Sequence, residues 1–281
     1  MSIIKEYKPK ALSNKKLTVE CFNTASEVVE VAKTRKITNS SFNDMQRPGE
    51  VSEGWHSVKS YNEALHLMET GYQAAVDEMK AQIKANFAGQ GKRISFKNDI
   101  VGYAPIVPLA IQGVPNSMQN SYMKPIKAKV IDVYYDMTAA SSYKPKDFMK
   151  AGSEMLSAII ELEAQGYKFN LYAVQSYNDS RDADVLVVKV KSSNTPLDLK
   201  RISFPLTHPA FFRVIGFDWY SKMPKARYRS CYGHALGYDY DNEKLTNAFE
   251  EMFGKKCVFF AANKIIGKGK DYMKGVLTNG K

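Results

Sequence analysis

The second half of the chain alternates apolar runs with amphipathic stretches. Four apolar runs predict buried strands: AKVIDVYY at 128–135, YKFNLYAVQ at 167–175, ADVLVVKV at 183–190 and KKCVFFAAN at 255–263. Such runs are typical of strands covered on both faces. Between the first two, apolar residues recur at helical spacing from Phe148 to Leu162, behind Pro145 and before Gly166. The pattern predicts a βαβ unit within an α/β, three-layer Rossmann-like, mostly parallel sheet. The short polar link SYNDSRD predicts that the second and third strands are antiparallel neighbours, with one of them at an edge of the sheet.

The first 125 residues have a different pattern. Residues 1–20 are polar and basic, which predicts a loosely held arm with at most a short strand. Thr24 with Glu27 and Ser60 with Glu63 form capping boxes, so we expect a helix after each. The stretch 93–125 is apolar but rich in proline and glycine, which excludes a central strand or a long helix. We therefore divide the chain into 1–125, a basic arm, helices and a Pro-rich connection packed on the core, and 126–281, the α/β domain.

Charge is the most informative total property. The 281 residues carry 40 Lys and Arg against 29 Asp and Glu, a net charge of +11 with a pI of about 9.3. A chain this basic adheres to polyanions, above all nucleic acids, unless its lysines serve only solubility. No apolar run reaches the roughly 18 residues of a membrane span, and the start predicts no secretory signal. Three cysteines without CxxC spacing fit reduced thiols, so we expect a cytoplasmic protein and no membrane partner.

Several stretches together carry a resemblance to a known family. They are EGWHSVKSYNEALHLMETGY, GYAPIVPLAIQGVPNSM, DVYYDMTAASS with LEAQGYKFNLYAV, and LTHPAFFRVIGFDWY, and the resemblance as a whole covers about residues 22–220. Their order resembles phage-encoded von Willebrand factor A-like proteins that have an N-terminal helical region. The resemblance implies a Rossmann-like domain, a viral origin and a location in the host cell cytoplasm. It implies little about activity.

The resemblance also implies a metal-ion-dependent adhesion site in the loop after the first strand. The parent fold binds Mg²⁺ there through Asp-x-Ser-x-Ser, because hard oxygen ligands suit that ion. Here Asp136 and Thr138 match, Ala140 stands at the third position, and Ser141 and Ser142 follow. The prediction is a degenerate site with no bound cofactor, the alternative being Mg²⁺ on Asp136, Thr138 and Ser141. Otherwise Asp136 and Thr138 cap the turn.

No motif favours an enzyme. Cys231 and His234 are close in sequence but lack an orienting third residue, and GKGK at 267–270 lacks the spacing of a phosphate loop. Binding is better supported, because cations alternate with aromatic residues between 220 and 240. Cations neutralise phosphates and aromatic rings stack on unpaired bases, which favours single strands. The candidate nucleic-acid-binding residues are Lys222, Lys225, Arg227, Tyr228, Arg229 and Tyr232, with Lys264, Lys268 and Lys270 from the lysine-rich tail. Tyr220, Tyr238 and Tyr240 are their aromatic neighbours.

The sequence therefore predicts a non-enzymatic, phage-encoded accessory protein. It would bind single-stranded DNA during viral transcription or replication, and a viral polymerase is a possible protein partner. Two alternatives stay open: a von Willebrand factor A-like protein-interaction module that uses Asp136, Thr138, Ser141 and Ser142, with or without a metal, and a virion structural component. The choice between DNA and RNA and the oligomeric state also stay open.

Overall fold

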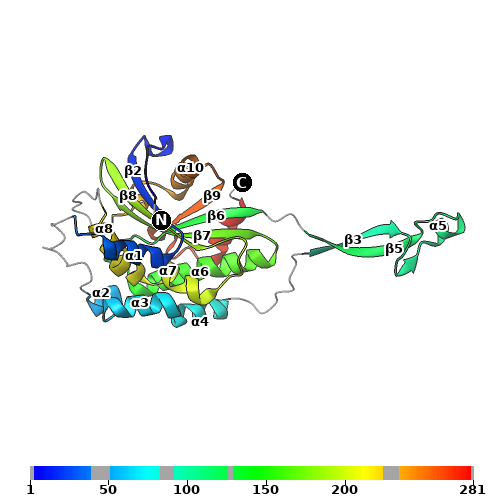
Figure 1. The fold of residues 1–281 in the computed structure, drawn as a ribbon, viewed down its shortest axis with the longest axis horizontal. Coiled ribbons are helices and arrows are strands. Elements are labelled where there is room, and N and C mark those ends of the chain that lie inside the picture. The colour runs from blue at the N-terminus through cyan, green and yellow to red at the C-terminus, as the bar shows by residue number, and fades with distance from the viewer. Residues whose placement is uncertain (1–2, 39–50, 83–91, 126–128, 224–233, 280–281) are drawn as a thin grey trace.

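The computed structural model describes residues 3–38, 51–82, 92–125, 129–223 and 234–279. A six-stranded sheet forms the centre of the main body (Figure 1), in the order β1-β2-β8-β7-β6-β9. Its strands are β1 Ile3–Tyr7, β2 Lys16–Phe22, β6 Val130–Asp136, β7 Lys168–Asn178, β8 Asp182–Lys191 and β9 Cys257–Ala261. The pairs β2–β8, β7–β6 and β6–β9 are parallel, and β1–β2 and β8–β7 are antiparallel. The predicted mixed α/β fold with a mostly parallel sheet is confirmed.

Helices cover the two faces of this sheet unequally. One face packs on α1 Ala25–Thr34, α6 Pro145–Ala164, α7 Leu199–Thr207, the π-helix η3 Phe211–Gly216 and α8 Phe217–Ser221. α3 Tyr61–Thr70 and α4 Gln73–Gln82 form an outer layer over α6 and α7, and α12 Lys270–Asn279 packs beside α6. On the other face, the helices among the described residues are α10 Asn242–Phe253, the short η1 Lys10–Leu12 and α9 Leu236–Asp239. Two further short helices are α2 Glu53–His56 and α11 Ala262–Ile265.

The capping boxes form as the sequence predicts. The Thr24 and Ser60 side chains accept hydrogen bonds from the backbone N–H of Glu27 and of Glu63, at 3.2 and 3.1 Å. Each glutamate accepts in turn from the backbone N–H of the residue before the cap. Within the described residues, no helix combines the length and the apolar composition needed to cross a membrane.

The N-terminal arm prediction is wrong, because β2 is an interior strand between β1 and β8. Its polar side chains are buried with distant partners. Glu20 is fully buried, forms two hydrogen bonds with Arg35 at 2.9 and 2.7 Å, and accepts another from Trp219 at 2.8 Å. The antiparallel pairing of β7 and β8 is confirmed, but β8 is not at an edge, because β2 pairs with its free side.

The Pro-rich segment is not a connection packed on the core, which corrects that prediction. β3 Lys92–Asp99, β4 Ala104–Pro105 and β5 Met118–Pro125 form a separate antiparallel sheet, with α5 Val107–Ile111 at its tip. This unit projects from the body as a narrow arm (Figure 1). The prolines do exclude a central strand, as predicted, since Pro105 ends β4 and Pro108 lies in the first turn of α5.

The exposed strand edge at β9 is protected by α10. The N–H groups of Cys257, Phe259 and Ala261 are hydrogen-bonded to three side chains spaced one turn apart on that helix. These side chains are Glu250, Thr246 and Asn242, with distances of 3.1, 3.0 and 3.0 Å. A strand edge whose outward N–H groups are occupied is a poor template for pairing with another chain.

Candidate functional site: the Asp136 loop and an aromatic–lysine pocket

Asp136 ends β6 at the centre of a buried hydrogen-bond network. Its carboxylate accepts from the Thr138 N–H at 2.9 Å and from the Ser176 hydroxyl. The Ser176 hydroxyl oxygen accepts from the Leu236 N–H at 2.9 Å, and Thr138 Oγ1 accepts from the Ser176 N–H at 2.9 Å. The network therefore joins the carboxyl ends of β6 and β7 to the start of α9. Burial raises the pKa of Asp136 to about 6, and the bonds from Ser176 and Thr138 oppose that rise.

The loop after Asp136 is held in place by residues from elsewhere in the chain. The Ala140 N–H donates to the Tyr238 hydroxyl at 2.8 Å. The guanidinium of Arg213, which is 2% exposed, donates to the carbonyl oxygens of Ala140 and Tyr143 and, at 2.7 Å, of Trp55. Burial lowers the pKa of Arg213 to about 10. The loop is thus fixed by three hydrogen bonds to side chains.

The three residues of the alternative Mg²⁺ site, Asp136, Thr138 and Ser141, differ in environment. Asp136 and Thr138 are fully buried and Ser141 is exposed, so the structure does not bring the three together in one cavity. Both Asp136 oxygens already accept hydrogen bonds within the protein. Among the described residues, no group of three or more His, Cys, Asp or Glu side chains could hold a metal ion. The geometry fits the turn-capping interpretation of Asp136.

The predicted basic and aromatic residues fall into three groups. Lys225, Arg227, Tyr228, Arg229 and Tyr232 lie outside the described residues. Lys264 and Lys268 are exposed. Lys222 and Lys270 are engaged in ion pairs, with Asp218 at 2.6 Å and with Glu161 at 2.6 Å.

Two neighbouring tyrosines already stack on other rings of this chain. Tyr220 is 2% exposed and stacks on Tyr177, with ring centroids 4.0 Å apart, so its expected place on a binding surface is corrected. Tyr238 is half-buried and stacks on His234.

His234 Nε2 lies 3.2 Å from Asp239 Oδ1, an orienting partner that the sequence did not reveal. Cys231 lies outside the described residues.

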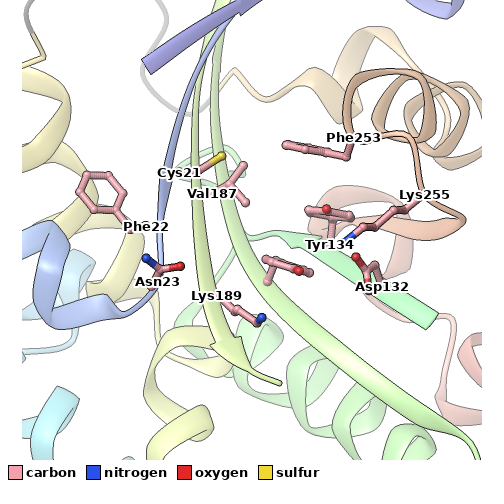
Figure 2. Close-up of a pocket in the computed structure, with 10 residues that line it drawn as sticks. Cys21, Phe22, Asn23, Asp132, Tyr134, Val187, Lys189, Phe253 and Lys255 are labelled. Atoms are coloured by element: carbon pink, nitrogen blue, oxygen red, sulfur yellow. The ribbon is translucent and has the colours of Figure 1, made fainter. Parts of the chain in front are cut away.

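A pocket of about 220 Å³ opens on the sparsely covered face of the sheet. The sheet reverses direction between β7 and β8, so the carboxyl ends of β2 and β8 meet the amino ends of β6 and β7 there. The side chains that line it are Cys21, Phe22, Asn23, Asp132, Tyr134, Tyr172, Val187, Lys189, Phe253 and Lys255. Figure 2 shows Tyr134, Phe253 and Lys255 on one side, with Cys21, Val187 and Lys189 on the strands opposite. α10 ends at Phe253, so it does not extend over this part of the sheet.

Three aromatic rings form one wall of the pocket. Tyr134 stacks on Tyr172 at 4.6 Å with 12° between the planes, and on Phe253 at 5.4 Å with 8°. Tyr134 is buried between the two, whereas Tyr172 and Phe253 are half-buried. Burial and the charge of Asp132 raise the pKa of Tyr172 to about 12. Tyr172 and Phe253 are thus uncharged and partly accessible, and an aromatic ligand could contact them.

Two lysines supply positive charge to the same pocket. Lys189 is half-buried and Lys255 is exposed. Among the described residues, neither forms an ion pair. The neighbouring carboxylate, Asp132, accepts a hydrogen bond from Asn170. Burial raises the pKa of the Cys21 thiol to about 11, so the thiol is protonated at neutral pH and is a poor nucleophile. The pocket is suited to binding a small, flat anion.

Sequence reasoning missed this pocket. Asp132, Tyr134 and Lys189 were assigned to strands, with no reason to place them together. The one available signal was polar residues at alternate positions in otherwise apolar runs, such as Asp132 before Tyr134.

Comparison with known proteins identifies a family but no function. The family described as a domain of unknown function, DUF7192, matches residues 6–256. The chain belongs to this family. The match includes β2, the projecting arm and α10, so both the sheet and the arm lie within the family's domain. No curated protein and no solved structure matches the chain.

Proposed function

We propose that this protein is a non-enzymatic nucleic-acid-binding accessory protein that prefers single strands. In this proposal, the aromatic–lysine pocket receives one unpaired base and the adjoining phosphates contact the lysines. The sequence resemblance extends the proposal to a phage-encoded protein that serves viral transcription or replication.

One observation carries the proposal: a stack of three rings lies beside two lysines that have no acidic partner among the described residues. A half-buried cation without a partner loses hydration and gains no ion pair, so an anionic ligand at Lys189 would be favourable. The volume of about 220 Å³ is below the usual range of about 300–1,000 Å³ for drug-sized ligands. It would suit a single base better than a dinucleotide. The net charge of +11 supports the same class of ligand.

The energetic scale is set by stacking and by phosphate neutralisation. Stacking of a base on an aromatic side chain contributes about 1–3 kcal/mol. Its loss would weaken affinity by about 5- to 150-fold. Each phosphate contact adds salt dependence, because binding releases counterions from the nucleic acid.

Fluorescence anisotropy with a labelled oligo(dT), an RNA of the same length and a duplex, over a salt titration, tests the proposal. We expect Tyr172→Ala to weaken single-strand binding within the range above. We expect Lys255→Glu to weaken it and to flatten the salt dependence. Lys256→Glu is the matched control, because Lys256 is the next residue and is also exposed, but it pairs with Glu250 and does not line the pocket. Equal effects of the two lysine variants would reject the pocket, and no binding at low salt would reject the function.

We further propose that the main sheet is von Willebrand factor A-like and that the Asp136 loop contacts a protein partner. Two observations support this second function. β6 lies between β7 and β9 with its carboxyl end leading into the loop, and the exposed Ser141 and Ser142 lie on a loop whose backbone is fixed by Arg213 and Tyr238. A pull-down from infected-host lysate, followed by loss of the captured protein in Ser141→Arg, would test it.

A further inference from the structure

The projecting arm is an apolar surface with no core of its own. No residue between 95 and 122 is buried, and Ile100, Val101 and Ile111 are 68%, 73% and 81% exposed. Phe96, Tyr103, Val107, Val114 and Tyr122 are also exposed. A two-stranded hairpin alone is at best marginally stable in water, and β4 adds only two residues to the pair β3–β5. A contiguous exposed apolar surface is a mark of an interaction site.

The arm also lacks charge where it is most apolar. Residues 100–123 contain no Asp, Glu, Lys, Arg or His, although the chain as a whole carries +11. An uncharged surface can enter an apolar site without the cost of removing charges from water. It can also approach a second copy of a basic chain without adding to the electrostatic repulsion between the two.

The same chain has an apolar groove on its body. The groove encloses about 330 Å³ between α10, β9 and α12. Its walls include Val258, Phe259, Tyr272 and Val276, and Tyr272 is 41% exposed. Because Asn242, Thr246 and Glu250 already bond the outward N–H groups of β9, strand addition is disfavoured here. The groove is suited to apolar side chains.

We infer that the arm of one copy docks its uncharged tip into the α10–β9–α12 groove of a second copy. The two surfaces match in chemistry, and no described residue of the single chain fills either of them. An eight-residue strand such as β3 spans about 27 Å, enough to reach beyond the body to a neighbour. The contact joins two different surfaces, so each copy offers one arm and one groove. Such a head-to-tail contact produces rings or filaments. The inference does not depend on the proposed nucleic-acid site.

The test uses two variants of the full chain that each disable one surface. Val101→Asp/Ile111→Asp places two negative charges on the arm, at residues whose side chains are exposed. Tyr272→Asp places one negative charge in the groove. Ile3→Asp/Ile37→Asp is the control, because both residues are exposed, at 58% and 47%, and lie outside the arm and the groove lining. Mass is measured by sedimentation velocity and light scattering over a range of concentrations, and circular dichroism verifies folding.

We expect the native chain and the control to form species larger than a dimer as concentration rises. Each disabled variant alone should be monomeric. An equal mixture of the two should stop at a dimer, because only one intact arm and one intact groove are then available for each pair. A native chain that stays monomeric, or a mixture that stays monomeric, would overturn the inference. Flotation of the native protein with phosphatidylcholine–phosphatidylserine vesicles, lost in the arm variant while its mass is unchanged, would assign the arm to a membrane instead.

Discussion

Asp136 gives the sharpest prediction for stability, because its carboxyl is fully buried and titrates near neutral pH. Its pKa is about 6 in the folded protein against an ordinary value of 3.8. The folded state therefore binds the Asp136 proton more tightly than the unfolded chain does. The stability that this proton contributes is fully present below pH 3.8 and is lost as the pH rises through 6. The difference between these two pKa values corresponds to a contribution of about 3 kcal/mol to the free energy of unfolding.

The perturbation is Asp136→Asn, which keeps the shape of the side chain and removes the charge. The variant should lose this pH dependence, while its altered hydrogen bond to Ser176 contributes a term that is independent of pH. The free energy of unfolding of the variant minus that of the native protein should thus rise by about 2 kcal/mol between pH 4 and pH 7.5, because part of the native protein's loss already occurs below pH 4. Urea titrations followed by tryptophan fluorescence at several pH values measure this difference. Asp77→Asn, at an exposed residue of α4, controls for the loss of one carboxylate.

If the difference in the free energy of unfolding between variant and native protein is flat over this pH range, or falls as pH rises, the reasoning is refuted.

The same titrations, repeated with Mg²⁺, test the metal site. We expect no change on adding Mg²⁺ or EDTA, because the Asp136 oxygens accept hydrogen bonds from Ser176 and Thr138 and because Ser141 is exposed. A gain in stability that needs both Mg²⁺ and an intact Asp136 would instead establish a metal site there.

Three further substitutions test helix packing and the protection of the β9 edge. In Gly152→Ala, the new Cβ would lie 2.1 Å from a backbone oxygen of α7, so α6 and α7 must separate. We expect the free energy of unfolding, measured by urea titration, to fall by about 1–3 kcal/mol or more. Gly275→Ala in α12 meets nothing within 4 Å and should instead stabilise by about 0.5–1 kcal/mol; equal effects at the two sites would contradict the packing argument. Thr246→Val removes the side-chain acceptor for the Phe259 N–H at the edge of β9. The free energy of unfolding should fall by about 1–3 kcal/mol, and the Phe259 amide should exchange its hydrogen faster. Unchanged exchange at Phe259 would count against the edge protection.

The elements that the sequence predicted well depend on local patterns. The Thr24 and Ser60 capping boxes lie within four residues of their partners, and the buried strands of the second half are continuous apolar runs. Such features are decided by neighbours along the chain, so periodicity and capping chemistry suffice to find them.

The elements that it missed depend on partners far away in the chain. β2 contains Glu20, which looks exposed in sequence, but Arg35 and Trp219 satisfy its carboxylate in the interior. The Pro-rich segment looked like core cover because it is apolar, and sequence alone does not say whether an apolar surface faces its own chain or another. Tyr220 looked like a binding residue because cations follow it, whereas its ring packs on Tyr177.

The sequence by itself therefore determined the α/β class, the helix starts, the strands of the βαβ unit and the positive charge of the chain. Only the tertiary structure decided that β2 lies inside the sheet, beside β8. That strand order, together with the antiparallel β7–β8 pair, brings Cys21, Asp132, Lys189 and Lys255 around one pocket, although they are spread over most of the chain. The physical reason is that strand order and direction follow from which faces can be buried together, a property of the whole core and not of any one segment.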